Sequence, residues 1–311
     1  MANVKIFSGS SSRYLADKIA LAYGNALGSS ETIRFSDGEM SPYYKESVRG
    51  SDVFIIQSTF PPADNFLELL LMVDAARRAS AESVTVVVPY FGYARQDRKD
   101  KPRVAIAAKM IANLISASGA DRLVACDLHA DQIQGFFDIP FDHLDGTSIF
   151  VPYLRSLKLD HILFASPDVG GVKRTRNFAS FFNADMVVCD KHRKRANEVA
   201  SMQLIGDVTD ADVVLVDDLI DTGGTIVRAA KLIMENGAKS VRAVCTHPVL
   251  SGKAYENIEK SVLEELVVTD TIPSKESPNV KILTVANIFA KAIRKIHDHE
   301  SISSLFIKQS I

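Results

Sequence analysis

The sequence predicts an α/β fold in which mostly parallel strands are covered by helices on both faces. Short apolar runs rich in β-branched residues, such as VKIF, VTVVV and VVLV, lack the alternation of half-exposed strands and are typical of strands buried on both sides. Between such runs, longer segments repeat apolar residues at helical spacing. Strands and helices therefore take turns along the chain, as they do around a parallel sheet.

The expected strands, in chain order, cover residues 4–9, 51–59, 83–91, 121–129, 161–168, 184–190, 212–218 and 240–248. Two helices stand out, FLELLLMVDAARRAS at residues 66–80 and TIVRAAKLIMENG at residues 225–237. The second has a stop signal at Gly237, because glycine readily adopts the left-handed conformation that ends helices.

The two halves of the chain show a faint internal repeat. Residues 51–58, a helix and residues 81–90 resemble residues 211–218, a helix and residues 238–247. Duplication of one α/β unit explains this, and chance similarity between buried strands is the alternative. We expect two similar domains, at residues 1–147 and 148–311, with a boundary near residues 144–150.

Composition excludes several function classes. The 311 residues are 47% hydrophobic and carry a formal net charge of −2, which gives no general attraction to nucleic acid or to anionic membranes. No apolar run approaches the ~18 residues of a membrane span. Three widely spaced cysteines in apolar runs suit reduced thiols rather than a disulfide framework. We expect a cytoplasmic protein with no nucleic-acid or membrane partner.

The segment VVLVDDLIDTGGTI, residues 213–226, places carboxylates and glycines beyond a buried strand, where ligands bind in open parallel sheets. Glycine N–H groups, threonine hydroxyls and the start of the following helix can hold a phosphate. Adjacent carboxylates instead suit vicinal hydroxyls or a hydrated Mg²⁺. The segment favours a sugar phosphate as ligand, and an acidic helix N-cap is the alternative. The residues concerned are Asp217, Asp218, Asp221, Thr222, Gly223, Gly224 and Thr225.

Two other segments place polar groups at the end of an expected strand. In CDLHADQIQGFFDIPFDHL, residues 126–144, His129 lies beside carboxylates, where it can ligate a divalent metal or reach a phosphate, although a structural histidine is the alternative. In SPDVGGVKRTRNFA, residues 166–179, Asp168 and a glycine pair predict a diphosphate-binding turn that opens a helix. The basic residues after that turn also fit a solvated face.

Two runs are strongly basic. In YFGYARQDRKDKPR, residues 90–103, basic residues follow aromatic ones, a pattern that can bind single-stranded nucleic acid, but one short run in an acidic chain argues against that partner. DKHRKRANEV, residues 190–199, fits a solvated basic loop when taken alone. FSDGEM, residues 35–40, reads by itself as an ordinary turn.

In their order along essentially the whole chain, these segments closely resemble the ribose-phosphate diphosphokinases of the bacterial and mammalian type, the phosphoribosyl-diphosphate (PRPP) synthetases. VVLVDDLIDTGGT resembles a motif that they share with type I phosphoribosyltransferases, whereas the stretch around His129 resembles a signature that phosphoribosyltransferases lack. The resemblance implies two phosphoribosyltransferase-type domains. It also implies transfer of the β,γ-diphosphoryl group of ATP to the C1 hydroxyl of ribose 5-phosphate, giving PRPP and AMP for nucleotide, histidine and tryptophan biosynthesis.

The resemblance assigns a role to each segment. It implies that His129 and Asp168 hold Mg²⁺, and that Lys191 and Arg193 neutralise charge that develops on the transferred group. The residues implied to contact ATP are Phe35, Asp37, Glu39, Arg95, Gln96, Asp100 and His129. The residues implied to bind ribose 5-phosphate are those listed above for the 213–226 segment. The turn that faces the diphosphate comprises Asp168, Gly170 and Gly171.

Members of this family commonly assemble as hexamers, in which the loop at residues 35–40 reaches a neighbouring subunit, and many respond to phosphate and ADP at a separate site. The matches to that allosteric site are Ser47, Arg49, Gln134, Ser301 and Ser303.

Two positions depart from the family pattern. Asp131 stands where regulated relatives usually have serine, and Pro102 interrupts the basic loop where serine is common. Because a carboxylate repels anions, we expect Asp131 to alter the phosphate dependence. Two alternative functions stay open at this point, a type I phosphoribosyltransferase and a non-catalytic subunit associated with the synthetase.

Overall fold

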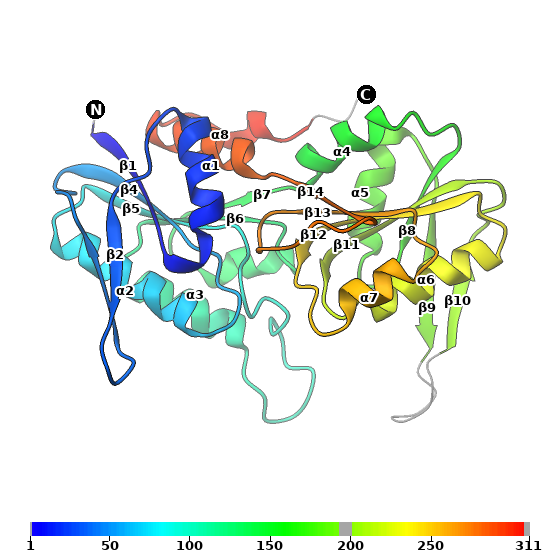
Figure 1. The fold of residues 1–311 in the computed structure, drawn as a ribbon, viewed down its shortest axis with the longest axis horizontal. Coiled ribbons are helices and arrows are strands. Elements are labelled where there is room, and N and C mark those ends of the chain that lie inside the picture. Colours follow the sequence, from blue (N-terminus) through cyan, green and yellow to red (C-terminus); the bar gives the residue numbers. More distant parts are fainter. Residues whose placement is uncertain (1, 193–200, 308–311) are drawn as a thin grey trace. The chain divides into compact units, whose positions relative to one another are not determined.

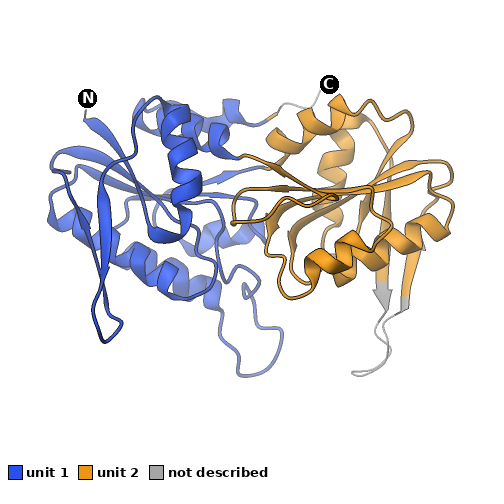
Figure 2. Cartoon of the chain, in the orientation of Figure 1, with its two compact units in different colours: residues 1–145, 285–306 blue, residues 146–284, 307–311 orange. Residues whose placement is uncertain are grey.

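The computed structural model describes residues 2–192 and 201–307 (Figure 1). The chain forms two compact units, residues 1–145 with 285–306 and residues 146–284 with 307–311 (Figure 2). Each unit contains a mostly parallel sheet with helices packed on it, which confirms the predicted α/β class. The division predicted at residues 147 and 148 stays a prediction, because compactness does not test which segments fold as domains.

Within the described residues, the first unit is built on a parallel sheet with the strand order β1-β4-β5-β6-β7. An antiparallel pair, β2 and β3, stands apart from this sheet. Helices α1 and α8 lie on one face of the sheet, and α2 and α3 lie on the other (Figure 1). The elements are β1 (Asn3–Ser8), η1 (Ser10–Ser12), α1 (Arg13–Tyr23), β2 (Ser30–Arg34), β3 (Met40–Tyr44), β4 (Ser51–Ile56), α2 (Asp64–Arg78), β5 (Ser83–Val88), α3 (Ala107–Ala117), β6 (Arg122–Cys126), η2 (Asp131–Phe136), β7 (Phe141–Leu144), α8 (Ala286–His297) and η3 (Ile302–Leu305).

The second unit has the strand order β10-β9-β8-β11-β12-β13-β14, in which the described strands are parallel except for the β9–β10 pair. Helices α4 and α5 cover one face, and α6 and α7 cover the other (Figure 1). The elements are α4 (Thr147–Ser156), β8 (Ile162–Ser166), α5 (Val172–Phe182), β9 (Met186–His192), β10 (Ser201–Ile205), β11 (Asp212–Ile220), α6 (Gly224–Glu235), β12 (Ser240–Pro248), α7 (Ala254–Glu259), β13 (Glu265–Thr269) and β14 (Val280–Leu283).

Strand β11 shows why its apolar run must be buried on both faces. Successive side chains of a strand point to opposite sides of the sheet. Val213 and Leu215 belong to the core beneath α6, whereas Val214 and Val216 pack in the core that includes Phe178 of α5. An unbroken apolar run is therefore favoured here, as the sequence predicted.

The two units repeat one strand order, because β1-β4-β5-β6-β7 corresponds to β8-β11-β12-β13-β14. The segments that resemble each other in sequence form β4-α2-β5 and β11-α6-β12, each a pair of neighbouring parallel strands joined by a helix. Helix α6 ends ahead of Gly237, whose φ is 93°, as predicted. The second unit extends its sheet with β9 and β10, whereas the first leaves β2 and β3 outside its sheet.

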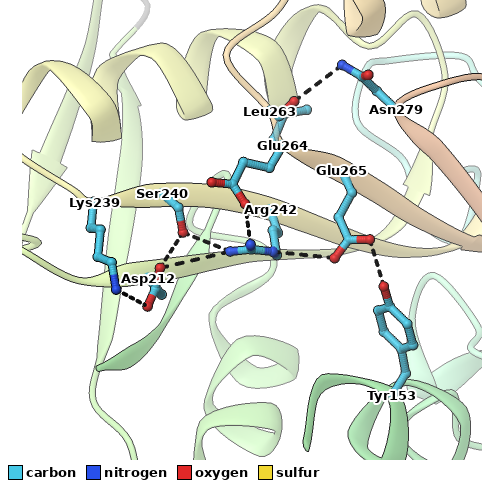
Figure 3. A network of polar contacts seen from close by, with 9 residues as sticks. All are labelled: Tyr153, Asp212, Lys239, Ser240, Arg242, Leu263, Glu264, Glu265 and Asn279. Carbon is cyan, nitrogen blue, oxygen red and sulfur yellow. Dashed lines mark hydrogen bonds and ion pairs between the residues drawn. The ribbon is translucent and has the colours of Figure 1, made fainter. Parts of the chain in front are cut away.

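A polar network around Arg242 ties the amino ends of strands in the second unit (Figure 3). The Arg242 guanidinium lies 4.0 Å from Asp212 and 3.4 Å from Glu265, and it also pairs with Glu264. The Tyr153 hydroxyl donates to Glu265 at 2.7 Å. Because parallel strands begin at one edge and end at the other, this network lies at the edge opposite to the predicted phosphate-binding segments.

The turn that follows β1 is hydrogen-bonded to a carboxylate of the protein itself. Glu68 of α2 is 2% exposed. It accepts hydrogen bonds from the Ser10 N–H at 2.9 Å, the Ser10 hydroxyl at 2.6 Å and the Gln57 amide at 2.8 Å, and also from the Thr32 hydroxyl. The repeat places this turn in correspondence with the turn after β8, where Asp168 and the glycine pair lie.

Candidate functional site

The 217–225 loop begins inside a strand. Strand β11 continues to Ile220, two residues further than expected, so Asp217 and Asp218 belong to the strand. The two carboxylates differ in exposure, because Asp218 is buried whereas Asp217 is half-buried. The backbone then turns at Gly223, whose φ of 75° is left-handed, and α6 begins at Gly224. A glycine is favoured at position 223 for this reason.

Side chains from distant parts of the sequence hold the 217–225 loop. The Ser251 N–H donates to the Asp221 carbonyl at 3.0 Å, and the Ser251 hydroxyl bonds the Asp221 carboxylate. The Asn257 amide donates to the Thr222 carbonyl at 3.1 Å. Sequence reasoning missed Ser251 and Asn257, because no local pattern links them to a loop about thirty residues away.

The 168–171 turn leads from β8 into α5. The Gly171 N–H donates to Oδ1 of Asp168 at 3.1 Å, and the Ser166 hydroxyl donates to the Asp168 carbonyl at 2.6 Å. A Cβ at position 171 would lie 2.7 Å from the Ser166 hydroxyl, so a larger residue there would displace that hydroxyl. Asp168 is exposed, and its second carboxylate oxygen can face a ligand.

The 168–171 turn and the 217–225 loop lie side by side. Strands β8 and β11 are parallel neighbours, with Ala165 opposite Leu215, so both segments leave the same edge of the sheet. From β8 the sheet continues to β9 on one side and to β11 and β12 on the other. This reversal of strand order is where open α/β sheets bind ligands. The structure therefore brings together the two predicted phosphate-binding segments.

An ion pair joins the two segments. Arg174, on the first turn of α5, donates to Asp218 at 2.9 Å, and Asp218 is 4% exposed. The basic residues after the 168–171 turn are therefore not all on a solvated face, since the Arg174 side chain is only 22% exposed. Its role could not be read from the sequence, where Lys173, Arg174 and Arg176 look alike.

Asp217, the other of the two adjacent carboxylates, has a shifted pKa. Burial raises the pKa of Asp217 well above its usual value, and the nearby Asp218 carboxylate raises it again. The Arg174 guanidinium acts in the opposite sense. Asp217 is half-buried as a residue, yet its carboxyl is crowded enough to disfavour the charged form. A ligand that donates hydrogen bonds or brings positive charge would relieve this cost.

The residues predicted to contact ATP all lie in the first unit. Arg95, Gln96 and Asp100 are exposed on the loop after β5, and His129 is exposed on the loop after the neighbouring strand β6. The Gln132 amide donates to Asp97 at 3.1 Å, which links these two loops. The remaining three, Phe35, Asp37 and Glu39, are exposed around the tip of the β2–β3 hairpin.

The predicted allosteric residues also lie in the first unit. Ser47 and Arg49 are neighbours in the loop before β4, where the Arg49 N–H donates to the Ser47 hydroxyl at 3.4 Å. Gln134 is in η2, and Ser301 caps η3, with its hydroxyl 2.8 Å from that of Ser303.

One of the two predicted charge-neutralising residues, Lys191, lies near the end of β9. Lys191 belongs to that strand and pairs with Met202 of β10 in the backbone register. Arg193 lies outside the described residues. Their predicted role therefore stays a prediction.

No preformed metal centre is found in the part of the chain that the structure describes, where no three or more His, Cys, Asp or Glu side chains are arranged to hold an ion. Proteins usually bind Mg²⁺ through one or two carboxylates together with substrate phosphates and water. The exposed Asp168 carboxylate beside the glycine pair is suited to that use.

Comparison with known proteins agrees with these features. The family model for the N-terminal domain of ribose phosphate pyrophosphokinase matches residues 4–119, and that for the phosphoribosyl synthetase-associated domain matches residues 179–307. The ribose-phosphate pyrophosphokinase of Porphyromonas gingivalis is 54% identical over 98% of this chain and 98% of its own. That of Campylobacter jejuni is 55% identical over 99% of this chain and 100% of its own.

A solved structure extends the agreement to the fold. The crystal structure of phosphoribosylpyrophosphate synthetase from Mycobacterium smegmatis matches with a TM-score of 0.91 and 36% identity, over 96% of this chain and 99% of that one. The fold and the paired loops define an α/β transferase that acts on phosphorylated substrates. The chain belongs to the ribose-phosphate pyrophosphokinase family. The family and enzyme class predicted from the sequence are confirmed.

Proposed function

We propose that this chain transfers the β,γ-diphosphoryl group of ATP to the C1 hydroxyl of ribose 5-phosphate, giving PRPP and AMP for nucleotide, histidine and tryptophan biosynthesis. One observation carries this proposal beyond family membership. The 168–171 turn and the 217–225 loop leave adjacent strands and are joined by the Arg174–Asp218 pair. PRPP combines a sugar phosphate with a diphosphate, and two neighbouring anion-binding turns suit a molecule with those two groups.

Ribose 5-phosphate is assigned to the 217–225 loop. Backbone N–H groups at Gly223 and Gly224, with the hydroxyls of Thr222 and Thr225, suit the 5-phosphate at the start of α6. The carboxylates of Asp217 and Asp221 suit the ribose hydroxyls. Burial of Asp218 and its ion pair with Arg174 favour an indirect role in binding, through the position of the loop.

ATP is assigned to the exposed residues of the first unit, on the strength of the family resemblance. Mg²⁺ is assigned to Asp168 and His129 on the same basis. When bound, the ion neutralises phosphate charge and lowers the pKa of a coordinated hydroxyl. Lys191 and Arg193 are proposed to stabilise the charge of the transition state.

Assembly, regulation and location complete the proposal. Phe35 is 53% exposed at the hairpin, and such an aromatic side chain is suited to contact an adenine ring in a neighbouring subunit of a hexamer. ADP and phosphate are proposed as effectors at the allosteric residues of the first unit. Three buried free thiols are consistent with a cytoplasmic location.

A coupled assay tests the activity. Purified protein is incubated with Mg²⁺, ATP and ribose 5-phosphate, and AMP and PRPP are followed with and without added phosphate. Equal amounts of AMP and PRPP, formed only when both substrates are present, are the expected result. If neither product forms while ATP or PRPP still binds, the chain is a non-catalytic subunit or a phosphoribosyltransferase instead.

Replacement of Lys191 tests its assigned role. In Lys191→Ala we expect kcat to fall by more than about 10³-fold, because a cation positioned on the transferred group acts chiefly in the transition state. The KM for ribose 5-phosphate should change far less. Lys231→Ala, which removes an exposed lysine of α6, is the control for loss of one positive charge. A kcat near that of the control would remove Lys191 from the mechanism.

A further inference from the structure

The 127–131 loop, which carries His129, has an unusual backbone. Asp127 has a φ of 39°, a left-handed conformation that residues with a side chain rarely adopt. Its N–H donates to the Leu144 carbonyl of β7 at 3.0 Å. The next residue, Leu128, is buried, whereas His129 is exposed. The direction in which His129 points therefore depends on how the backbone at residues 127 and 128 is held.

A histidine side chain holds the second of these backbone groups. Strand β7 pairs with β6 so that His143 lies opposite Ala125, next to the start of the loop. The Leu128 N–H donates to Nε2 of His143 at 2.9 Å. The His143 side chain is 18% exposed, so water competes only weakly for this bond.

This hydrogen bond fixes the tautomer of the His143 ring. Nε2 accepts a hydrogen bond from the Leu128 N–H and so carries no proton of its own, which places the proton of the neutral ring on Nδ1. Nδ1 lies 4.0 Å from Oδ1 of Asp131. The Gln134 amide nitrogen, 3.4 Å from Nδ1, does not hydrogen-bond the protonated Nδ1, because both atoms are donors, and it donates to the Asp131 carbonyl at 3.0 Å instead. A carboxylate near Nδ1 favours the proton on that nitrogen. Asp131 thus stabilises the form of His143 that can hold Leu128.

We propose that His143 is a positioning residue for the reaction: it holds the Leu128 N–H and thereby sets the direction of His129, while Asp131 keeps its ring in the required tautomer. The proposal rests on the function proposed above, in which His129 contacts ATP and Mg²⁺. It gives Asp131 a role in orienting the 127–131 loop, in addition to any effect of its charge on anion binding.

Three variants test the proposal in the full-length protein. His143→Phe keeps a planar ring but cannot accept a hydrogen bond. His143→Gln offers an amide oxygen close to the place of Nε2. Asp142→Asn is the matched control, because Asp142 precedes His143 in β7, faces the opposite side and bonds Arg122 at 2.7 Å.

For His143→Phe we expect kcat to fall by about 10- to 100-fold, since small misplacements of a substrate-binding group have costs of that order. The KM for ribose 5-phosphate should stay within about twofold, because its proposed loop belongs to the other unit. His143→Gln should recover most of kcat, and Asp142→Asn should stay near wild type. If His143→Phe matches Asp142→Asn in kcat, the proposal is overturned.

Hydrogen exchange read by mass spectrometry provides a readout independent of activity. The peptide that contains residues 127–131 should exchange at least about tenfold faster in His143→Phe than in wild type and Asp142→Asn. Unchanged exchange would overturn the proposal. If wild type forms no PRPP, the proposed function fails, and exchange alone decides whether His143 holds the loop. If His143→Phe does not fold, Asp131→Asn takes its place, with faster exchange of the same peptide expected.

Discussion

Asp217 and Asp218 are identical in type and adjacent in sequence, yet the structure gives them different surroundings. Asp218 is buried and paired with Arg174 of α5, whereas Asp217 is half-buried and accepts a hydrogen bond from the Asp218 N–H at 2.9 Å. The sequence indicated that a pair of carboxylates lies at this strand end. It could not indicate which one faces a ligand, because that depends on where β11 ends and on the distant Arg174.

The raised pKa of Asp217 predicts how stability depends on pH. The folded chain binds the Asp217 proton more tightly than the unfolded chain does, so the free energy of unfolding falls as pH rises from about 4 through the folded-state pKa. An amide side chain at this position would not titrate. Asp217→Asn should therefore be more stable than wild type at pH 7, by on the order of 1 kcal/mol, and this advantage should vanish near pH 4.

Urea unfolding at a series of pH values measures this difference. Asp160→Asn, at an exposed position of the same unit, is the control for loss of a carboxylate. Parallel pH profiles for wild type and Asp217→Asn would show that the Asp217 carboxyl is not destabilised in the folded chain.

At the scale of the elements, the two glycines at the start of α6 differ in backbone conformation. Gly223 is left-handed, with a φ of 75°, whereas Gly224 is helical, and a Cβ there would meet its nearest neighbours at 3.8 Å. Gly223→Ala should lower the free energy of unfolding by about 1–2 kcal/mol, whereas Gly224→Ala should lower it by less than about 0.5 kcal/mol. Chemical denaturation of both variants makes the comparison, and equal losses would contradict the assigned turn geometry.

Disruption of the Arg242 network should lower the stability of the fold without lowering the catalytic rate. Arg242→Ala would leave the buried Asp212 and the half-buried Glu265 without their guanidinium, so we expect a destabilisation of about 2 kcal/mol. Lys239→Ala removes a largely exposed partner of Asp212 and should change stability by less than about 0.5 kcal/mol. Because the network lies at the strand edge away from the 217–225 loop, kcat should be unchanged in both. A kcat that falls with stability would contradict this separation.

The sequence predicted the central strands but missed several edge elements, for physical reasons. β4, β5, β11 and β12 are buried on both faces, which forces continuous apolar runs. The β2–β3 pair has no buried residue and contains Pro42, and β7 and β14 are short strands at sheet edges, so these sequences carry weaker signals. β13 is apolar and central, and its run LVV was simply too short to stand out.

For the whole molecule, the parallel strands expected from the sequence predicted that the phosphate-binding segments follow the carboxyl ends of strands. The family resemblance supplied the roles of the individual residues. The contacts that hold the site were not predictable. Arg174 reaches Asp218 over a separation of 44 residues, and His143 reaches the 127–131 loop across a strand pairing. Such contacts depend on packing between elements, which leaves no local pattern in a single sequence.

The three cysteines report on the integrity of both units. Burial raises the thiol pKa values of Cys126 and Cys245 well above the usual value for cysteine. It raises the pKa of Cys189 to about 11. The thiolate is the reactive form, so native protein at pH 8 should react with a thiol reagent far more slowly than unfolded protein. Labelling during a urea titration, with mass spectrometry of peptides, should show Cys126 reporting on the first unit and the other two on the second. Rapid labelling of native protein would contradict the burial of these side chains.

The Glu68 carboxylate in the turn after β1 bears on the history of the duplicated unit. Its four hydrogen bonds supply to the first unit, from within the chain, the kind of anion that the proposed function assigns to a substrate in the second unit. Under the proposed function, one copy is completed by folding and the other by binding. An internal side chain in place of the ligand removes the need for sugar-phosphate contacts on the first copy, so that its loops can serve the nucleotide while the proposed sugar-phosphate site stays with the second copy.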